Sequence, residues 1–290
     1  MQLLVTLRKT KNIEKLKNAC DGFIVGSLFS SGYNYSLNDL VAINKYCKNN
    51  AISLYVSIDD LISETEKPQL KQYFDFLSKL EIDGIYFHDL AIYNIAKTYN
   101  LENKLIYDGY TMICNSLDVQ YYLSKGINGV VLSREITLDE IKNIITINPM
   151  CCDIMIFGHS RLSYSKRKFL TNYFREIKSS YDYMNTDSLR LVEEKRDYKM
   201  PIIEDSSGTK IYTDYILQMY KELPDLKAYV KRGIVDSIFV EDDKVLSVLR
   251  DYKRISNENA EFLFDGLNLS YPDNYSTGFL YQKTNITKDE

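Results

Sequence analysis

Short apolar runs alternate along the chain with longer stretches in which apolar residues recur every three or four positions. The runs are rich in β-branched and aromatic residues, as buried strands are. They occur at Leu3–Leu7, Gly22–Gly26, Ser53–Ile58, Gly84–His88, Lys104–Tyr107, Gly129–Ser133, Cys152–Gly158 and Ser237–Glu241. The stretches with helical spacing include Leu37–Lys48, Gln69–Leu80, Leu117–Lys125 and Leu138–Ile147. The pattern predicts eight strands that alternate with helices.

Two of the expected helices begin with a capping residue. Ser36 precedes one, and Thr137 precedes another with Glu140 three positions on, which is the spacing of a capping box. Near-continuous apolar strands joined by helices indicate a parallel sheet that is covered on both faces. Eight such units predict an α/β fold of the (β/α)8, TIM-like type. An open doubly wound sheet is the alternative, but no GxGxxG follows the first strand.

The seventh unit is interrupted by a long insertion. More than fifty residues separate Gly158 from a helix expected to begin near Thr213, which is too long for an ordinary loop. Within it, extended Pro201–Glu204, a Ser-Ser-Gly turn and Lys210–Tyr212 predict a hairpin. We therefore expect residues 1–290 to form a single barrel domain, with the insertion 159–212 over the C-terminal mouth of the barrel.

The insertion is basic although the chain is acidic. Residues 161–199 hold ten Lys/Arg and six Asp/Glu, a local charge of +4 in a chain of net charge -4. Catalytic and binding residues of barrels lie at the C-terminal mouth, so a basic segment there suggests a contact surface for phosphate, RNA or an acidic partner. The alternative is a solvated loop whose charges only maintain solubility.

Several polar residues follow predicted strands and are candidates for the mouth. The two histidines, His88 and His159, end strands four and seven, where they serve either the site or only the structure. Further candidates after strands five and six are Thr111, Asn115, Arg134 and Glu135. An arginine here either grips a carboxylate or phosphate, or forms an ion pair at the rim.

The insertion offers two other kinds of chemistry. Ser163 and Ser165 are possible nucleophiles, but no GxSxG elbow or Ser-Lys motif accompanies them. Glu204 and Asp205 are adjacent carboxylates. We favour a structural use for them, as partners of the basic insertion, over acid–base catalysis.

The cysteines do not have the spacing of a metal site. Cys20, Cys47, Cys114, Cys151 and Cys152 include no CxxC pair, and free buried thiols are the simpler interpretation. No stretch has the roughly 18 apolar residues of a membrane span, and the start of the chain lacks the pattern of a signal peptide. These features predict a cytoplasmic protein without a membrane contact.

Three segments resemble the peptidase U32, or collagenase-like, family. They are FGHSRLSYSKRKFLTNYF at 157–174, MPIIEDSSGTKIYTD at 200–214 and LPDLKAYVKRGIVDSIFVE at 223–241, with VVLSREITLDEI upstream. Within the family, the chain is most similar to the smaller member of a pair of U32 proteins found in many Gram-positive bacteria. The resemblance implies a role in prephenate-dependent 5-hydroxylation of the wobble uridine of tRNA, beside a larger U32 subunit.

The chain departs from the family at the expected cluster ligands. Many members carry an iron–sulfur cluster, and when the sequences are aligned on Ser163 and Ser165 two ligand cysteines become Arg161 and Lys168. No cysteine follows Cys152. Because such clusters need several thiolates, we expect no iron–sulfur cluster and no metal in this chain, while prephenate remains a possible ligand.

The same stretch supplies the expected contacts. The interpretation is a cationic loop that binds RNA or the partner subunit, through His159, Arg161, Ser165, Lys166, Arg167, Lys168 and Tyr173. Two alternatives remain from the sequence: a U32-type peptidase or other hydrolase, and a barrel that binds a small anionic metabolite near Arg134, Arg161 and Lys166. The catalytic residues are not identified at this stage.

Overall fold

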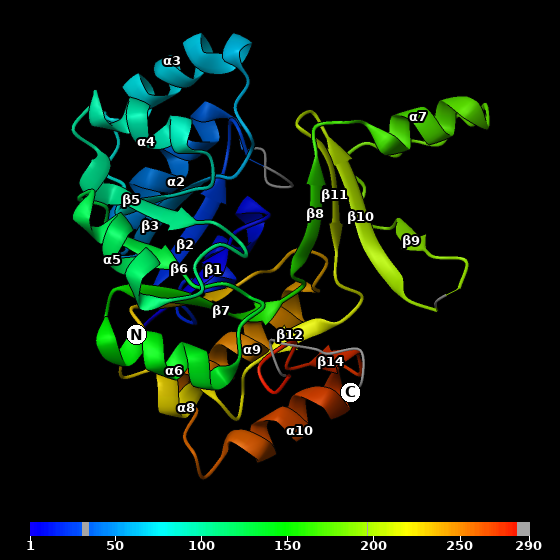
Figure 1. Ribbon diagram of the computed structural model, residues 1–290. Helices are drawn as coiled ribbons and strands as arrows, with labels where there is room; N and C mark the ends of the chain where they lie inside the picture. Colours follow the sequence, from blue (N-terminus) through cyan, green and yellow to red (C-terminus); the bar gives the residue numbers. More distant parts are fainter. Residues whose placement is uncertain (31–34, 196, 283–290) are drawn as a thin grey trace.

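The protein is built around a closed barrel of eight parallel strands (Figure 1). The computed structural model describes residues 1–30, 35–195 and 197–282. The barrel strands are β1 (Gln2–Thr6), β2 (Gly22–Gly26), β3 (Ser53–Ile58), β4 (Gly84–Phe87), β5 (Leu105–Asp108), β6 (Gly129–Val131), β7 (Cys152–Gly158) and β13 (Arg232–Val235). Strand β13 pairs in parallel with both β1 and β7 and so closes the sheet. The predicted (β/α)8 barrel is confirmed, and the open sheet is wrong.

Helices cover the outside of the barrel. They are α1 (Ile13–Leu16), α2 (Leu37–Asn49), α3 (Lys67–Leu77), α4 (Leu90–Lys97), α5 (Ser116–Ser124), α6 (Leu138–Ile147), α8 (Leu223–Leu226), α9 (Asp242–Arg254) and α10 (Ala260–Ser270), with 3-10 turns at Thr10–Asn12, Glu64–Glu66 and Glu102–Lys104. The predicted capping box of Thr137 and Glu140 begins α6, and Ser36 caps α2 through a similar box with Asp39. None of the described helices is long and apolar enough to cross a membrane.

The strands bury both of their faces. The main core lies between the strands and the helices, and a smaller cluster that includes Leu4, Ile106 and Ile234 fills the barrel. A buried ion pair lies beside this inner cluster, where Arg232 Nε donates to Asp153 Oδ2 at 2.7 Å. The pair is further satisfied by the Tyr86 hydroxyl, 2.8 Å from Asp153 Oδ2. The barrel interior is therefore a packed layer, as in other barrels of this size.

The insertion forms a sheet of its own. Its elements are β8 (Arg161–Ser165), α7 (Phe169–Glu176), β9 (Arg190–Val192), β10 (Lys199–Asp205) and β11 (Gly208–Tyr212), with antiparallel strand order β8-β11-β10-β9. The predicted hairpin is the β10–β11 pair. Gly208 closes it with a φ of +137°, and a Cβ there would lie only 2.1 Å from the carbonyl oxygen of Ser165. Only glycine fits this position.

Two predicted elements are wrong. The eighth strand is Arg232–Val235 rather than Ser237–Glu241, whose apolar residues form the loop after it. The prediction missed the true strand because the strand begins with a charged residue, Arg232, which is buried in an ion pair with Asp153. No helix begins near Thr213. Instead β12 (Ile216–Gln218) pairs antiparallel with β7 and parallel with β14 (Tyr275–Ser276).

The insertion sheet stands beside the carboxyl ends of the barrel strands, and α7 projects away from the barrel (Figure 1). The loop after β3 holds the near side of the insertion. Arg161 contacts Asp59 at 2.8 Å, Lys210 contacts Asp60 at 3.6 Å, and Lys166 contacts Glu66 at 2.6 Å. The ends of the insertion therefore join the barrel mouth, while its middle extends into solvent.

Candidate functional site

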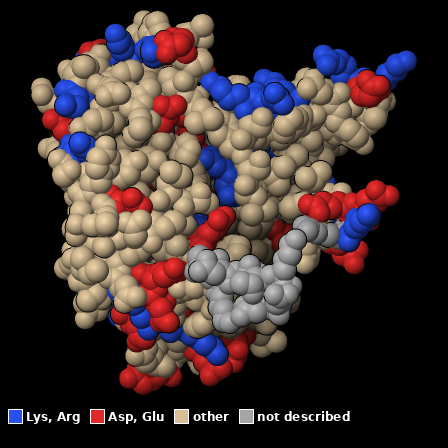
Figure 2. Space-filling view, viewed as in Figure 1, with Lys and Arg blue, Asp and Glu red and all other residues tan. Residues whose placement is uncertain are grey.

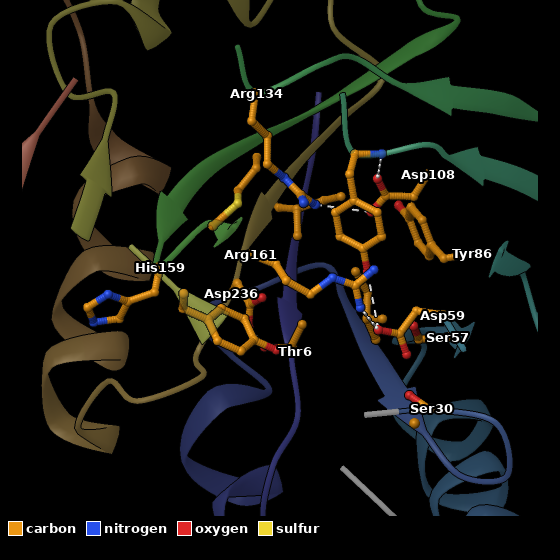
Figure 3. Close-up of a pocket in the computed structure, with 16 residues that line it drawn as sticks. Thr6, Ser30, Ser57, Asp59, Tyr86, Asp108, Arg134, His159, Arg161 and Asp236 are labelled. Atoms are coloured by element: carbon orange, nitrogen blue, oxygen red, sulfur yellow. Dashed lines mark hydrogen bonds and ion pairs between the residues drawn. The ribbon is translucent and has the colours of Figure 1, made fainter. Parts of the chain in front are cut away.

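A small cavity opens at the mouth of the barrel, between the strand ends and the insertion (Figure 3). Its volume is about 80 Å³, enough for several water molecules or part of a small ligand. Its polar lining consists of Thr6, Ser30, Ser57, Asp59, Tyr86, Asp108, Tyr110, Arg134, His159, Arg161, Tyr212 and Asp236. These residues come from the ends of several strands and from both ends of the insertion, which is where barrel sites form.

Tyr110 lies at the centre of the polar groups in the cavity. The guanidinium carbon of Arg161 is 3.6 Å from the centroid of its ring, and that of Arg134 is 4.6 Å away. The Tyr110 hydroxyl donates to Asp59 Oδ2 at 3.2 Å, the same oxygen that Arg161 contacts. Arg134 in turn pairs with Asp108 at 3.1 Å. Two cation–carboxylate pairs therefore flank one aromatic ring.

Burial controls the charges of this cluster. Burial raises the pKa of Tyr110 well above its usual value, so the phenol stays protonated and serves as a donor. Burial alone would lower the pKa of Arg161, but Tyr110 and Asp59 outweigh it and raise that pKa. The guanidinium is therefore permanently charged.

The cavity can bind a ligand that carries acceptor oxygens. Arg134 Nε is buried and has no hydrogen-bond partner within the described residues. Asp236 accepts the hydroxyl of Thr6 at 3.0 Å on the opposite side. A carboxylate or a carbonyl placed near Arg134 would satisfy this donor, while hydroxyl groups of the ligand would suit the carboxylate side.

The structure brings three of the sequence-predicted residues to this cavity: Arg134, Arg161 and His159. His159 is buried, its Nδ1 donates to the Thr213 carbonyl at 2.7 Å, and its ring packs on Phe239. Burial lowers the pKa of His159, so the imidazole is held neutral. In Figure 3 its ring points away from Arg161. His159 thus fixes the start of the insertion.

His88 is not among the residues that line the cavity. Its Nδ1 donates to the Asp108 carbonyl at 3.0 Å, and its ring centroid is 5.0 Å from that of Tyr110. The contact supports Tyr110 and orients the end of β5. Neither described histidine has a serine partner: Ser165 Oγ accepts the Arg167 N–H, and Ser163 lies exposed on β8.

The other predicted residues lie at separate places. Asn115 caps α5 by accepting the Asp118 N–H, and Glu135 is exposed on the loop after β6. Lys166 holds the β3–α3 loop through Glu66. Arg167, Lys168 and Tyr173 lie at or on α7.

Glu204 and Asp205 are fully buried within the insertion sheet. Asp205 pairs with Lys210 at 2.9 Å, and Lys210 is itself fully buried. Glu204 accepts the Leu170 N–H at 2.8 Å. Glu204 also accepts the hydroxyls of Thr171 and Thr209. Within the described residues, both carboxylates therefore contact other parts of the insertion.

Sequence reasoning missed the carboxylates and tyrosines of the cavity, above all Asp59, Asp108, Tyr110 and Asp236. A usable signal was present. Asp59 follows the predicted third strand directly, and Asp108-Gly-Tyr follows the fifth. Acidic residues just beyond parallel strands meet at one edge of the barrel, but they become informative only when several are considered together.

The thiols do not fit an iron–sulfur cluster. Cys20 and Cys47 lie near the amino ends of β2 and β3, and Cys151 and Cys152 lie at the amino end of β7. Cys114 is exposed in the loop after β5, at the opposite end of the barrel. A cluster needs three or four thiolates at one point. Arg161, where the resemblance implied a cluster cysteine, is paired with Asp59.

The sequence of this chain is similar to those of known proteins. A model of peptidase family U32 matches residues 27–290. The chain belongs to this family. This U32 protein is 26% identical over 261 residues to "tRNA hydroxylation protein P2" of Bacillus subtilis (strain 168). The matched region covers 87% of this chain and 84% of that protein. The chain is 22% identical over 200 residues to "tRNA hydroxylation protein P1" of the same organism, spanning 62% of this chain and 47% of P1.

Two further proteins are similar to this chain. The "Uncharacterized protease MJ0090" of Methanocaldococcus jannaschii is 23% identical over 272 residues, spanning 88% of this chain and 66% of that protein. The solved structure of the U32 peptidase Mk0906 superimposes with a TM-score of 0.49 at 12% identity, covering 81% of this chain and 92% of that one.

Proposed function

We propose that this U32 protein takes part in the hydroxylation of tRNA. The observation that carries the proposal is the similarity to P2, which spans 84% of that protein and 87% of this chain. The match to P1 adds a second relative that is named for tRNA hydroxylation. In its finer form, the proposed reaction is prephenate-dependent 5-hydroxylation of the wobble uridine.

The mouth cavity is the proposed binding site for prephenate. Prephenate carries two carboxylates and a hydroxyl group, and the cavity pairs the donors of Arg134 and Arg161 with the acceptors of Asp236 and Asp59. The Arg134 Nε, which has no hydrogen-bond partner among the described residues, is the donor that a carboxylate of the ligand would take. Tyr110 and Tyr212 present rings to the cavity, which suits the carbon ring of such a ligand.

The proposed working form is a heteromer with a larger U32 subunit that holds the cluster. The thiols of the described residues do not converge on one point, so the redox chemistry of hydroxylation would belong to the partner. The proposed location is the cytoplasm, because tRNA is the proposed substrate.

Complementation tests this function. The chain is expressed in a Bacillus subtilis strain that lacks P2, alone and together with the larger U32 protein of its own organism. Nucleosides from purified tRNA are then measured by mass spectrometry. Recovery of the hydroxylated wobble uridine supports the proposal. A folded, well-expressed chain that restores none, with or without its partner, contradicts it.

A further inference from the structure

The segment 166–184, which we call the α7 arm, exposes several large apolar side chains. It consists of α7, its preceding turn and the loop that follows, and it projects from the barrel in Figure 1. No residue of α7 is buried. Phe169, Tyr173 and Ile177 recur every four residues and are 44%, 57% and 51% exposed. Residues at this spacing share one helix face, so the arm presents an uncovered stripe.

A neighbouring face of the arm is packed, and it meets the stripe where the rings of Tyr173 and Phe174 lie 5.3 Å apart. The ring of Phe174 stacks on Tyr183 with centroids 4.8 Å apart and on Tyr181 at 5.5 Å. Glu204 anchors the start of the helix by accepting the N–H groups of Leu170 and Thr171. The stripe is therefore held in place on a fixed support, and a ligand would not have to order it.

Unpaired cations surround the stripe. Arg167, Lys168 and Lys178 form no ion pair within the described part of the chain, and Arg175 contacts only the Asn172 side chain, at 2.9 Å. Residues 166–178 hold five Lys/Arg and one Glu, which gives +4, whereas the rest of the chain is at -8. Figure 2 shows Lys and Arg atoms along the upper edge of the insertion, over α7.

We infer that the α7 arm binds a single-stranded loop of RNA. Exposed aromatic rings between cations form a stacking platform for unpaired bases, and the cations neutralise the phosphates. An acidic protein surface would fit the cations but would leave the rings without a specific role. The inference rests on the proposed function, because it assigns the contact with tRNA to this arm and not to the mouth cavity.

The structure also revises the contact set. Arg161 and Lys166 are occupied by Asp59 and Glu66, and His159 is buried. The RNA contacts are therefore Phe169 and Tyr173 for stacking, with Arg167, Lys168, Arg175 and Lys178 for phosphates.

Binding of a fluorescent tRNA transcript with a wobble uridine, and of its anticodon stem-loop, tests the arm. The full-length protein is compared with a triple variant, Arg167→Ala, Lys168→Ala and Lys178→Ala, across a range of salt concentrations. The matched control removes three exposed cations from the barrel side, Lys11→Ala, Lys45→Ala and Lys71→Ala. The arm variant should lower the slope of log affinity against log salt by about two to three, and the control should leave it unchanged.

A second set of variants tests whether the Tyr173 ring stacks on RNA bases. Tyr173→Ala should weaken stem-loop binding roughly 5- to 100-fold, and Tyr173→Phe should preserve it, because the ring is retained. Phe262→Ala removes a ring that is 78% exposed on α10 and serves as the control. Melting temperatures should stay unchanged in all these variants, since every altered side chain is half-buried or exposed.

Three outcomes overturn the inference. They are wild-type protein that binds neither RNA, arm variants that bind as wild type does, and arm variants that bind RNA normally but lose the larger U32 subunit in copurification. The last result would make the arm a protein contact. The wild-type chain could fail complementation and still bind RNA more tightly than the arm variants do. In that case the proposed function fails and the RNA contact stands.

Discussion

Arg161 and Asp59 join the insertion to the barrel across 102 residues of sequence. The guanidinium lies at the start of β8, the carboxylate follows β3, and their atoms are 2.8 Å apart. The Arg161 side chain is only 6% exposed. This buried ion pair therefore holds the start of the insertion against the mouth of the barrel.

Asp59→Ala should destabilise the protein strongly. It leaves the charge of Arg161 buried without its partner and removes the acceptor of the Tyr110 hydroxyl. The expected loss in the free energy of unfolding is about 3 kcal/mol. Urea denaturation measures it, and adding Arg161→Ala should cost less than the two single changes together. Lys79→Ala, which breaks an exposed pair with Asp75, should cost less than about 0.5 kcal/mol. Additive losses would show that the pair is not coupled.

Glu204→Ala should loosen the α7 arm. Glu204 is fully buried and accepts hydrogen bonds from the Leu170 N–H and the Thr209 hydroxyl, both at 2.8 Å. Unsatisfied donors cost about 1–3 kcal/mol. Hydrogen exchange should accelerate in residues 169–183 and stay unchanged in the barrel strands. Glu204→Gln keeps one acceptor and should have a smaller effect. Uniform protection in both variants would argue against the anchor.

The sequence predicted most of the barrel because its signal is local. Each strand and helix such as β3 or α6 carries its own periodicity and cap. Strand β13 was not predicted from its local sequence, because Arg232 interrupts its apolar run and its partner Asp153 lies 79 residues away. The residues of the barrel mouth are likewise far apart in the chain. Nothing near Arg161 in the chain indicates Asp59, so the cavity required the closed barrel before its residues could be grouped.

Asp60 predicts a pH dependence of stability. Burial and the charge of Asp59 raise the pKa of Asp60 to about 6, above its unfolded value of 3.8. The folded state therefore binds this proton more tightly, so ionised Asp60 costs stability above pH 6, and the cost disappears as the pH falls toward 4. Asp60→Asn should be more stable than wild type at pH 7.5, and the difference should shrink by pH 4.5.

Thermal unfolding at several pH values measures this difference. His159 is present in both proteins, so its contribution to the pH dependence cancels. Asp75→Asn, at an exposed site, provides the control for simple loss of charge. A wild-type protein that exceeds Asp60→Asn in stability at pH 7.5 would mean that the contact with Lys210, at 3.6 Å, outweighs burial.

The separated thiols predict that the purified chain binds no iron–sulfur cluster of its own. Protein prepared without oxygen should be colourless and lack stoichiometric iron, since Cys114 lies at the opposite end of the barrel from Cys151 and Cys152. Iron analysis and visible absorption provide the measurement. Cluster absorption that disappears on Cys151→Ser or Cys152→Ser would contradict the proposal.

Arg134→Ala tests the mouth cavity as a site for prephenate. The Arg134 side chain donates a hydrogen bond to Asp108 and lies over the Tyr110 ring, and its buried Nε has no partner in the described structure. If that donor takes a carboxylate of the ligand, its loss should weaken prephenate binding about tenfold or more, because hydrogen bonds to charged groups contribute about 1.5–3 kcal/mol. Saturating prephenate should raise the melting temperature of the wild-type protein, and the same concentration should raise that of Arg134→Ala much less. Arg250→Ala, an exposed change on α9, should respond as wild type does.

In the complemented strain, Arg134→Ala should lower the fraction of hydroxylated tRNA, and a larger supply of prephenate should partly restore it. Equal shifts of the melting temperature in Arg134→Ala and wild type would contradict the proposal that prephenate binds in this cavity, whatever the tRNA assay shows.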